Sequence, residues 1–289
     1  MTMKTILVPI EESDGLDAIL HTALLTAKIF GSYIEGLYYQ PTAASAMVVA
    51  GEGLVVTTPE LVESVEQQDR DRREQVYQQF KEFMADNNIP FGKPQLSQNT
   101  PQACWVEEES PNSEIVGSRS RVFDLTVVAR PKKGANIAAM SILEAALFEG
   151  GKPILIAPPI SPAKLDEHIA IAWNGSTETA RTIAFSMPFI NRAKKVTIIT
   201  IEDFGVPGPS AQELARQLEH NGIEIELDYK HVDRSKEGPG KVFLEEAKQI
   251  GADLLVKGAY TQSRIRQMIF GGATDYILWN SEIPVLMAN

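Results

Sequence analysis

The chain has 289 residues, of which 44% are hydrophobic and 22% are charged, and its formal net charge at pH 7 is −11. This composition predicts a globular protein with one large domain or two of ordinary size and excludes a disordered chain. An acidic protein lacks the basic face that a phosphate backbone requires, which excludes a general nucleic-acid binder.

Targeting and membrane segments are not expected. The opening residues MTMKTILVPIEESDG hold only a brief apolar run before acidic residues, which predicts a cytoplasmic protein without a signal peptide. The apolar stretch 43–56 is interrupted by Glu52 and is too short to span a bilayer. Four scattered histidines give no metal-ligand spacing. The single cysteine, Cys104, is interpreted as an ordinary half-buried residue.

The first half opens with alternating strand and helix patterns. A strand in KTILVPIEES (4–13) precedes an amphipathic helix at 16–31 and a second strand at 32–39. An insertion follows at roughly 41–75, and we interpret its apolar part, 41–58, as a lid over the strand ends or as a surface buried against a partner.

A charged stretch at 62–83 predicts a helix whose exposed face is laced with i,i+4 charge pairs. Its predicted core positions are Val65, Val76, Tyr77, Phe80 and Phe83. Later in this half, DLTVVARP (124–131) and GGKPILIAPP (150–159) are typical of buried strands. A proline-rich joint at 158–167 then separates a first domain, 1–158, from a second, 168–289.

The second half repeats the plan of the first. HIAIAWNGS (168–176) resembles the opening strand, DLLVKGAY (253–260) resembles DLTVVARP, and NSEIPVLMAN (280–289) resembles GGKPILIAPP. The predicted strands are 168–173, 196–201, 225–231, 253–257 and 284–287. The predicted helices are 177–191, 209–221, 239–250 and 272–280, with Pro209 in the first turn of the second of them.

Short apolar strands that alternate with helices predict an α/β fold in each half, with a doubly wound parallel sheet covered by helices on both faces. Ligands of such sheets lie beyond the carboxyl ends of the strands, where the strand order reverses. In the second half the loops at that point are 173–176 and 258–272. Glycines there permit close backbone approach, and the amides at the start of the last helix predict an anion site.

The chain resembles a tandem member of the universal stress protein family over its whole length, through ILVPIEES, IAIAWNGS, DLLVKGAY and the ending EIPVLMAN. This resemblance implies two five-stranded parallel sheets of order 3-2-1-4-5, packed as a pseudo-dimer through the edges of their last strands. The strands at 153–157 and 284–287 would each leave backbone N–H and C=O groups unpaired at a sheet edge, which favours that pairing. ATP-binding members of the family carry G-x-x-G, nine residues and then G-[S/T], with an Asp after the first strand.

The resemblance carries these positions onto the second half. Gly258 and Gly271 match motif glycines, Thr261 replaces the second glycine, Gly272 replaces the Ser or Thr, and Asn174 replaces the Asp. The nucleotide-binding residues expected there are Asn174, Gly175, Ser176, Ile201, Gly258, Thr261, Arg264, Arg266, Gly271, Gly272 and Thr274. A plain turn with a Ser N-cap explains the residues 174–176 nearly as well as a ligand does.

The first half departs further from the family pattern. Glu11 fills the position after its first strand, and with the adjacent Glu12 it leaves an anion site poorly neutralised. We interpret these carboxylates as solvated and noncatalytic. The positively charged Lys132 and Lys133 instead favour an anion site in this half. The expectation is that this half binds no nucleotide in the usual way.

The resulting hypothesis is a stress-response protein whose second half binds an adenine nucleotide, ATP or AMP, with little or no catalysis. Mg²⁺ is expected only together with nucleotide. The partners expected are the nucleotide, the other half of the chain and a second chain in a homodimer, with no nucleic acid and no membrane. Two alternatives stay open, namely a regulatory or scaffold protein without nucleotide and, ranked lower, a slow ATP-hydrolysing enzyme.

Overall fold

The computed structural model describes residues 3–11, 15–40, 59–93, 99–110, 112–131, 137–202, 204–230, 238–259 and 272–289. Within two of its helices, the side chains of residues 59–62, 65, 66, 137 and 138 also lie outside this description. The predicted role of 41–58 and the core position Val65 therefore stay predictions.

The first half alternates strands and helices as its sequence indicates. Its elements are β1 (Thr5–Pro9), α1 (Leu16–Phe30), β2 (Tyr33–Gln40), α3 (Pro59–Asp86), β3 (Gln102–Glu109), α4 (Glu114–Ser120), β4 (Leu125–Ala129), α5 (Ile137–Glu149) and β5 (Ile154–Ala157).

The second half follows the same order from β6 onward. Its elements are β6 (His168–Trp173), α6 (Thr177–Ile190), β7 (Lys195–Ile201), α7 (Ala211–Glu219), β8 (Ile225–Lys230), α8 (Pro239–Gln249), β9 (Leu254–Gly258), α10 (Ala273–Asn280) and β10 (Val285–Ala288). Pro209 was wrongly placed inside a helix. A capping box between Ser210 and Glu213 begins α7 at Ala211 and leaves the proline in the preceding loop.

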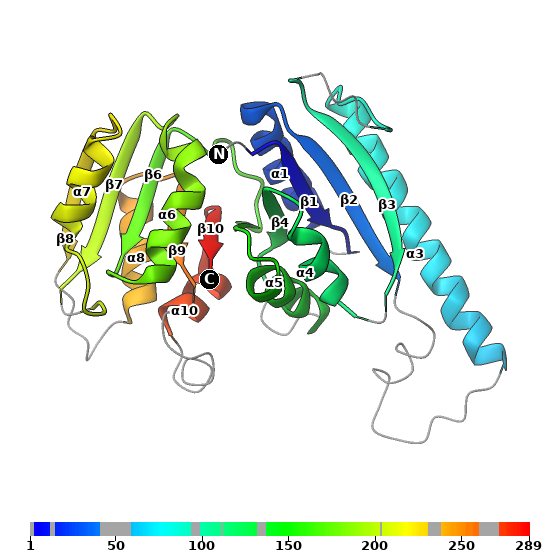
Figure 1. Cartoon of the computed structure of the whole chain (residues 1–289). Helices are drawn as coiled ribbons and strands as arrows, with labels where there is room; N and C mark the ends of the chain where they lie inside the picture. The colour runs from blue at the N-terminus through cyan, green and yellow to red at the C-terminus, as the bar shows by residue number, and fades with distance from the viewer. Residues whose placement is uncertain are drawn as a thin grey trace.

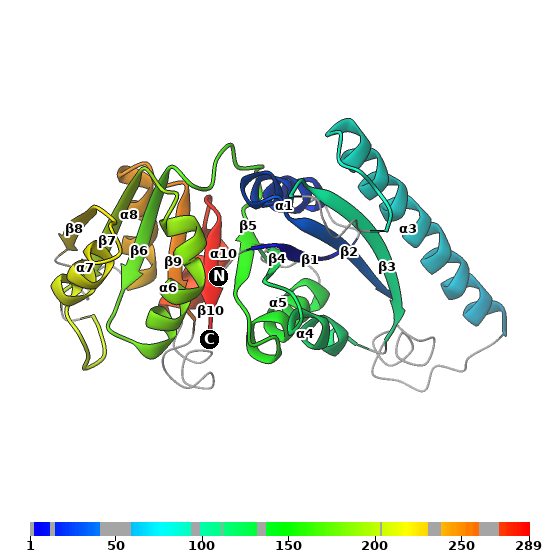
Figure 2. The same cartoon turned by 45° about the horizontal axis from the view of Figure 1, so that its top comes forward.

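The ten described strands form one sheet in the order β3-β2-β1-β4-β5-β10-β9-β6-β7-β8. Within each half the paired strands are parallel and follow the predicted order 3-2-1-4-5, which confirms the α/β fold class. At the centre β5 and β10 lie side by side and pair antiparallel, so two five-stranded sheets become one (Figures 1 and 2). This pairing joins the two strand edges that the sequence analysis expected to be unpaired in separate halves.

Two helical layers enclose the sheet, as each half requires to bury strands that are apolar on both faces. One core cluster joins one face of the sheet to α1, α3, α6 and α7. The other cluster joins the opposite face to α4, α5, α8 and α10. Across the junction between the halves, Phe30 of α1 meets Phe189 of α6 edge-on with 4.9 Å between ring centroids. Arg130 also donates to the carbonyl of Trp279 at 2.6 Å.

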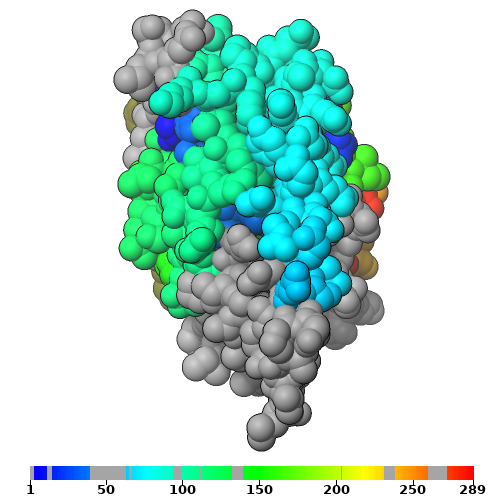
Figure 3. Space-filling view, turned by 90° about the vertical axis from the view of Figure 1, so that its right-hand side faces the viewer, coloured from blue at the N-terminus to red at the C-terminus, as the bar shows by residue number. Residues whose placement is uncertain are grey.

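The predicted charged helix is α3, which has 28 residues, whereas its counterpart α7 has nine. It lies along the outer side of the first half (Figure 3). Val76 and Phe80 are fully buried as predicted, and Tyr77 and Phe83 are half-buried. Within the described parts of the chain, no helix combines the length and apolar character needed to cross a membrane.

Candidate functional site

The turn between β6 and α6 is held by its own polar side chains. Asn174 Oδ1 accepts from the Ser176 amide at 3.2 Å and from the Thr179 hydroxyl at 2.7 Å. Ser176 Oγ accepts from the Thr179 amide at 3.2 Å and caps α6. Gly175 has φ +77°, in the left-handed region that favours glycine. Three residues predicted from the sequence thus lie together in a capped turn.

Replacing Ser176 with alanine is expected to lower the free energy of unfolding by about 1 kcal/mol, because the first turn of α6 loses its cap. Urea denaturation of ligand-free protein measures this change. Ser210→Ala, which removes the cap of α7, is the matched control and should cost a similar amount. An unchanged midpoint for Ser176→Ala would contradict a structural role for this hydroxyl.

The loop between β7 and α7 folds across this turn. Val206 donates its amide to the Asn174 carbonyl at 3.0 Å. A Cβ on Gly208 would overlap the carbonyl oxygen of Gly175, so glycine is required where the two backbones meet. The turn is therefore covered on one side by main chain.

A cleft of about 390 Å³ lies between this loop and the carboxyl ends of β6 and β7. Its volume is within the usual range for small-molecule sites. The cleft brings together Asn174, Gly175 and Ile201, three of the residues expected from the sequence. Apolar side chains of Trp173 and Phe204 also line it.

Gly258 ends β9 and packs against the first turn of α6. A Cβ there would overlap the Thr179 amide nitrogen and lie 2.6 Å from the carbonyl carbon of Glu178. Glycine at this position therefore serves the contact between β9 and α6. The sequence suggested a close approach of backbone to ligand, and the structure places a helix there.

Lys257, the residue before Gly258, is buried at the end of β9. Its Nζ donates to the Gly258 carbonyl at 2.7 Å and to Thr274 Oγ1 at 2.9 Å. Burial lowers the pKa of this amine to about 8. Thr274 itself is only 2% exposed, in the first turn of α10, and Gly272 is the N-cap residue of that helix.

Two carboxylates face this amine. Asp275 of α10 and Glu178 of α6 both act to raise the pKa of Lys257, although burial outweighs them. Glu178 Oε1 accepts from the Thr177 hydroxyl at 3.1 Å. Its other oxygen, Oε2, is buried and finds no donor among the residues that the structure describes. Sequence reasoning missed Lys257 and Glu178, although a lysine closing the apolar run DLLVK was a visible signal.

Comparison with known proteins finds a family match within the second half of the chain. The model of the family described as Universal stress protein family matches residues 202–289, from the end of β7 to β10. Residues 202–289 are therefore similar to the universal stress protein family.

Individual relatives extend the likeness. The Stress response protein NhaX of Bacillus subtilis (strain 168) is 37% identical over 49 residues, which are 17% of this chain and 30% of that protein. A universal stress protein from Archaeoglobus fulgidus DSM 4304 superposes over 100% of this chain and 97% of its own, with TM-score 0.71 and 15% identity. The functionally unknown protein PA1789 from Pseudomonas aeruginosa PAO1 covers 99% and 92%, with TM-score 0.53 and 13% identity. Identities this low show the fold alone, which both halves share.

Four of the residues expected in the universal stress protein site, namely Thr261, Arg264, Arg266 and Gly271, lie outside the described residues. Among the described ones, no three side chains of His, Cys, Asp or Glu gather as metal ligands would. The structure therefore describes Asn174, Gly175, Ser176, Gly258 and Gly272, whereas Gly271, Thr261 and the two arginines stay predictions.

In the first universal stress protein fold, Glu11 occupies the place that Asn174 has in the second. The expectation of a solvated carboxylate was wrong, because Glu11 is half-buried and burial raises its pKa to about 7. Tyr39 lies near it, since the Glu11 charge raises the pKa of that phenol. Glu12, Lys132 and Lys133 lie outside the described residues.

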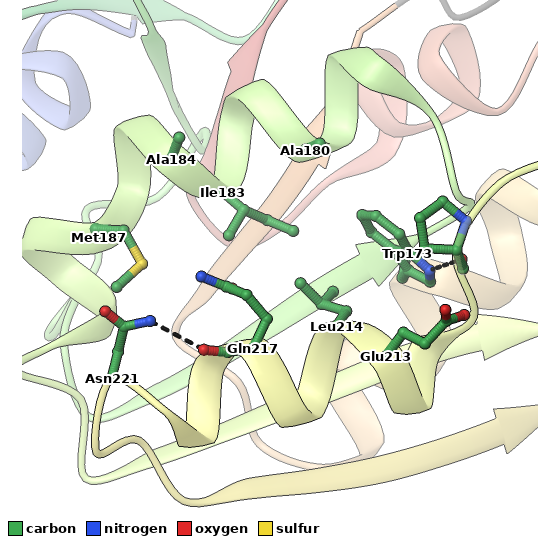
Figure 4. Close-up of a pocket in the computed structure, with 10 residues that line it drawn as sticks. Trp173, Ala180, Ile183, Ala184, Met187, Glu213, Leu214, Gln217 and Asn221 are labelled. Carbon is green, nitrogen blue, oxygen red and sulfur yellow. Dashed lines mark hydrogen bonds between the residues drawn. The ribbon is translucent and has the colours of Figure 1, made fainter.

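A second hollow, the α6–α7 groove, lies between helices α6 and α7 of the second half (Figure 4). It measures about 610 Å³ and is lined mainly by apolar side chains, among them Ile183, Met187 and Leu214. Trp173 lines both this groove and the cleft, and its indole N–H donates to the Pro209 carbonyl at 3.0 Å. Trp173 and Pro209 thus line both the groove and the cleft.

Proposed function

We propose that the second half of this universal stress protein binds an adenine nucleotide, ATP or AMP, and acts as a stress-response binding protein with little or no catalysis. The observation that supports this most is the 390 Å³ cleft, because it gathers Asn174, Gly175 and Ile201 at the carboxyl ends of β6 and β7. That is where open parallel sheets receive their ligands.

The lining of the cleft suits a nucleoside. Ile201, Phe204 and Trp173 offer apolar surface to a base, and the turn at 174–176 brings polar groups to its edge. The N-terminus of α10, where Gly272 is extended, would present backbone amides to a phosphate.

The same lining carries no catalytic step in our proposal. The described residues of the cleft include no histidine, cysteine or carboxylate, which are the usual acids, bases and metal ligands. Mg²⁺ would therefore be held by nucleotide phosphates rather than by these side chains. A cytoplasmic location and a homodimer of whole chains belong to the same proposal.

A regulatory or scaffold protein without nucleotide is the second candidate. The observation that favours it is the close packing of Gly208 on Gly175, which places main chain against the turn.

Isothermal titration with ATP and with AMP separates these candidates. Wild-type protein should bind one nucleotide per chain. Thr200→Trp, which adds a bulky ring to the cleft wall, should weaken binding at least about tenfold. Val122→Trp is the matched control, since Val122 is 77% exposed in the first half. Absence of heat at millimolar nucleotide, or binding that Thr200→Trp leaves unchanged, would favour the scaffold protein.

A further inference from the structure

The two ends of the ten-stranded sheet differ in how their outer edges are paired. At one end, Ala103 of β3 donates its amide to the Pro90 carbonyl, and its own carbonyl accepts from the Gly92 amide, both at 2.9 Å. At the other end β8 is the last strand (Figure 1). Among the described strands β8 pairs with β7 alone, which leaves its outer edge open. Such an edge is a template for a further strand.

The backbone groups on the open edge of β8 belong to alternate residues. The Lys230 carbonyl accepts from the Glu202 amide at 2.9 Å, on the side of β7. In a strand the N–H and C=O groups of successive residues point to opposite sides. Those of Ile225, Leu227 and Tyr229 therefore point outward, where a new strand would pair.

The side chains of these outward-pointing residues are apolar and only partly covered. Leu227 and Tyr229 share a face with Ile225, which packs against the core beneath α7, and they are 39% and 46% exposed. At the opposite end, Phe80 of α3 packs over Trp105 of β3 with 5.6 Å between ring centroids. Since α3 has 28 residues and α7 only nine, apolar surface stays uncovered at β8.

The other face of β8 carries Glu226, Asp228 and Lys230 in alternation. Two copies of β8 that pair antiparallel with Asp228 on a two-fold axis set Glu226 of each copy opposite Lys230 of the other. The same register sets each Leu227 opposite a Tyr229, in pairs that exchange two N–H···O bonds because both backbones point outward. Opposite charges and apolar side chains that face each other across strands stabilise a sheet.

The competing register is less favourable. It also pairs five of the six residues of β8, but it sets Leu227 opposite itself and each Glu226 opposite an Asp228. Like charges directly opposite each other destabilise a strand pair. In the first register the like-charged pair is Asp228 with its own copy, and Lys230 lies 3.3 Å from Asp228 within each chain, which offsets that repulsion. The strand is thus complementary to itself in one register.

We propose that two copies of this chain dimerise through β8, which pairs antiparallel with its counterpart about a two-fold axis at Asp228 and continues the sheet across both chains. This inference rests on the homodimer of the proposed function, whose contact surface it names, and it does not depend on nucleotide binding. A six-residue strand is only about 20 Å long, so the interface is smaller than that of a standard complex. We therefore expect reversible association in the micromolar range.

Cysteine cross-linking tests the register. Asp228→Cys, in a Cys104→Ser background, places two thiols opposite each other in a pair whose Cα atoms are about 4.5 Å apart, within disulfide range. Mild oxidation should yield a covalent dimer on a non-reducing gel. Glu226→Cys in the same background is the matched control, because the register separates those two cysteines by about 14 Å. No cross-link at 228, or equal cross-linking at both positions, would contradict this register.

Analytical ultracentrifugation of the protein without these cysteines measures the strength of the interface. The mass of the wild type should rise toward that of two chains as its concentration increases. Glu226→Lys and Lys230→Glu each set like charges opposite and should weaken dimerisation at least about tenfold. A mixture of the two variants restores both opposite-charge pairs and should recover the dimer. Glu107→Lys, on β3 at the other end of the sheet, is the control and should dimerise as the wild type does.

The outcomes separate this interface from the rest of the proposed function. A single-chain mass at all concentrations would refute dimerisation, and a dimer that Glu226→Lys leaves unchanged would place the contact elsewhere on the chain. A mixture that stays monomeric while circular dichroism shows both variants folded would also overturn the register. Failure of nucleotide to bind in the titration above would refute that activity and leave the β8 interface standing.

Discussion

Replacing Lys257 with methionine is expected to remove a pH-dependent contribution to stability of about 3 kcal/mol. Burial lowers the pKa of this amine from the ordinary 10.5 to about 8 in the folded state. Below pH 8 both folded and unfolded chains hold the proton, and the cost of burying the charge is present in full. Between pH 8 and 10.5 only the unfolded chain keeps it, so the wild type gains stability as the pH rises, by about 1.4 kcal/mol per unit.

Urea denaturation of both proteins from pH 7 to pH 10 measures this difference. The free energy of unfolding of the wild type, relative to that of Lys257→Met, should be constant below about pH 8 and rise from there to pH 10. Lys194→Met is the control, because that side chain is 76% exposed. Parallel pH profiles for wild type and Lys257→Met would show that the amine is not buried in the folded protein.

Much of the fold could be predicted because its signals are local. The strand 168–173 coincides with β6, and the helix 239–250 ends within one residue of α8, since apolar periodicity and flanking turn residues mark both. The start of α7 was misplaced by two residues because two start signals compete there. A proline permits a first turn, but the reciprocal bonds of Ser210 and Glu213 fix the cap one residue later.

The candidate site could be predicted only in part, because some of its contacts join residues that are distant in sequence. The turn at 174–176 depends on side chains that bond their own backbone, and such chemistry is visible in a few letters. The burial of Lys257 depends on α10 and α6 closing over the end of β9, and these elements are distant in sequence. The packing of Gly208 on Gly175 is equally non-local. Sequence patterns therefore located the site at the carboxyl edge of the sheet but did not predict that Lys257 is buried there.

Glu11→Gln is expected to stabilise the protein above pH 7 and to have little effect near pH 4.5. Burial raises the pKa of this carboxyl from 4.5 to about 7 in the folded state. Below pH 4.5 both folded and unfolded chains are protonated there. Between pH 4.5 and 7 the unfolded chain releases its proton while the folded chain retains it, so wild-type stability falls as the pH rises. Above pH 7 the loss is complete, at about 3 kcal/mol or less for a half-buried group.

Glutamine keeps the shape of the protonated acid and cannot ionise, so the variant should escape this loss. Thermal or urea unfolding at pH 5 and pH 8 measures it, with Glu107→Gln as the control because that side chain is 45% exposed. An equal difference between wild type and variant at both pH values would contradict a buried Glu11. Asn174 stands at the same place in the second half and is always neutral. A Glu11 that holds its proton up to about pH 7 would thus give both halves an uncharged polar group after their first strand, until rising pH charges only the first.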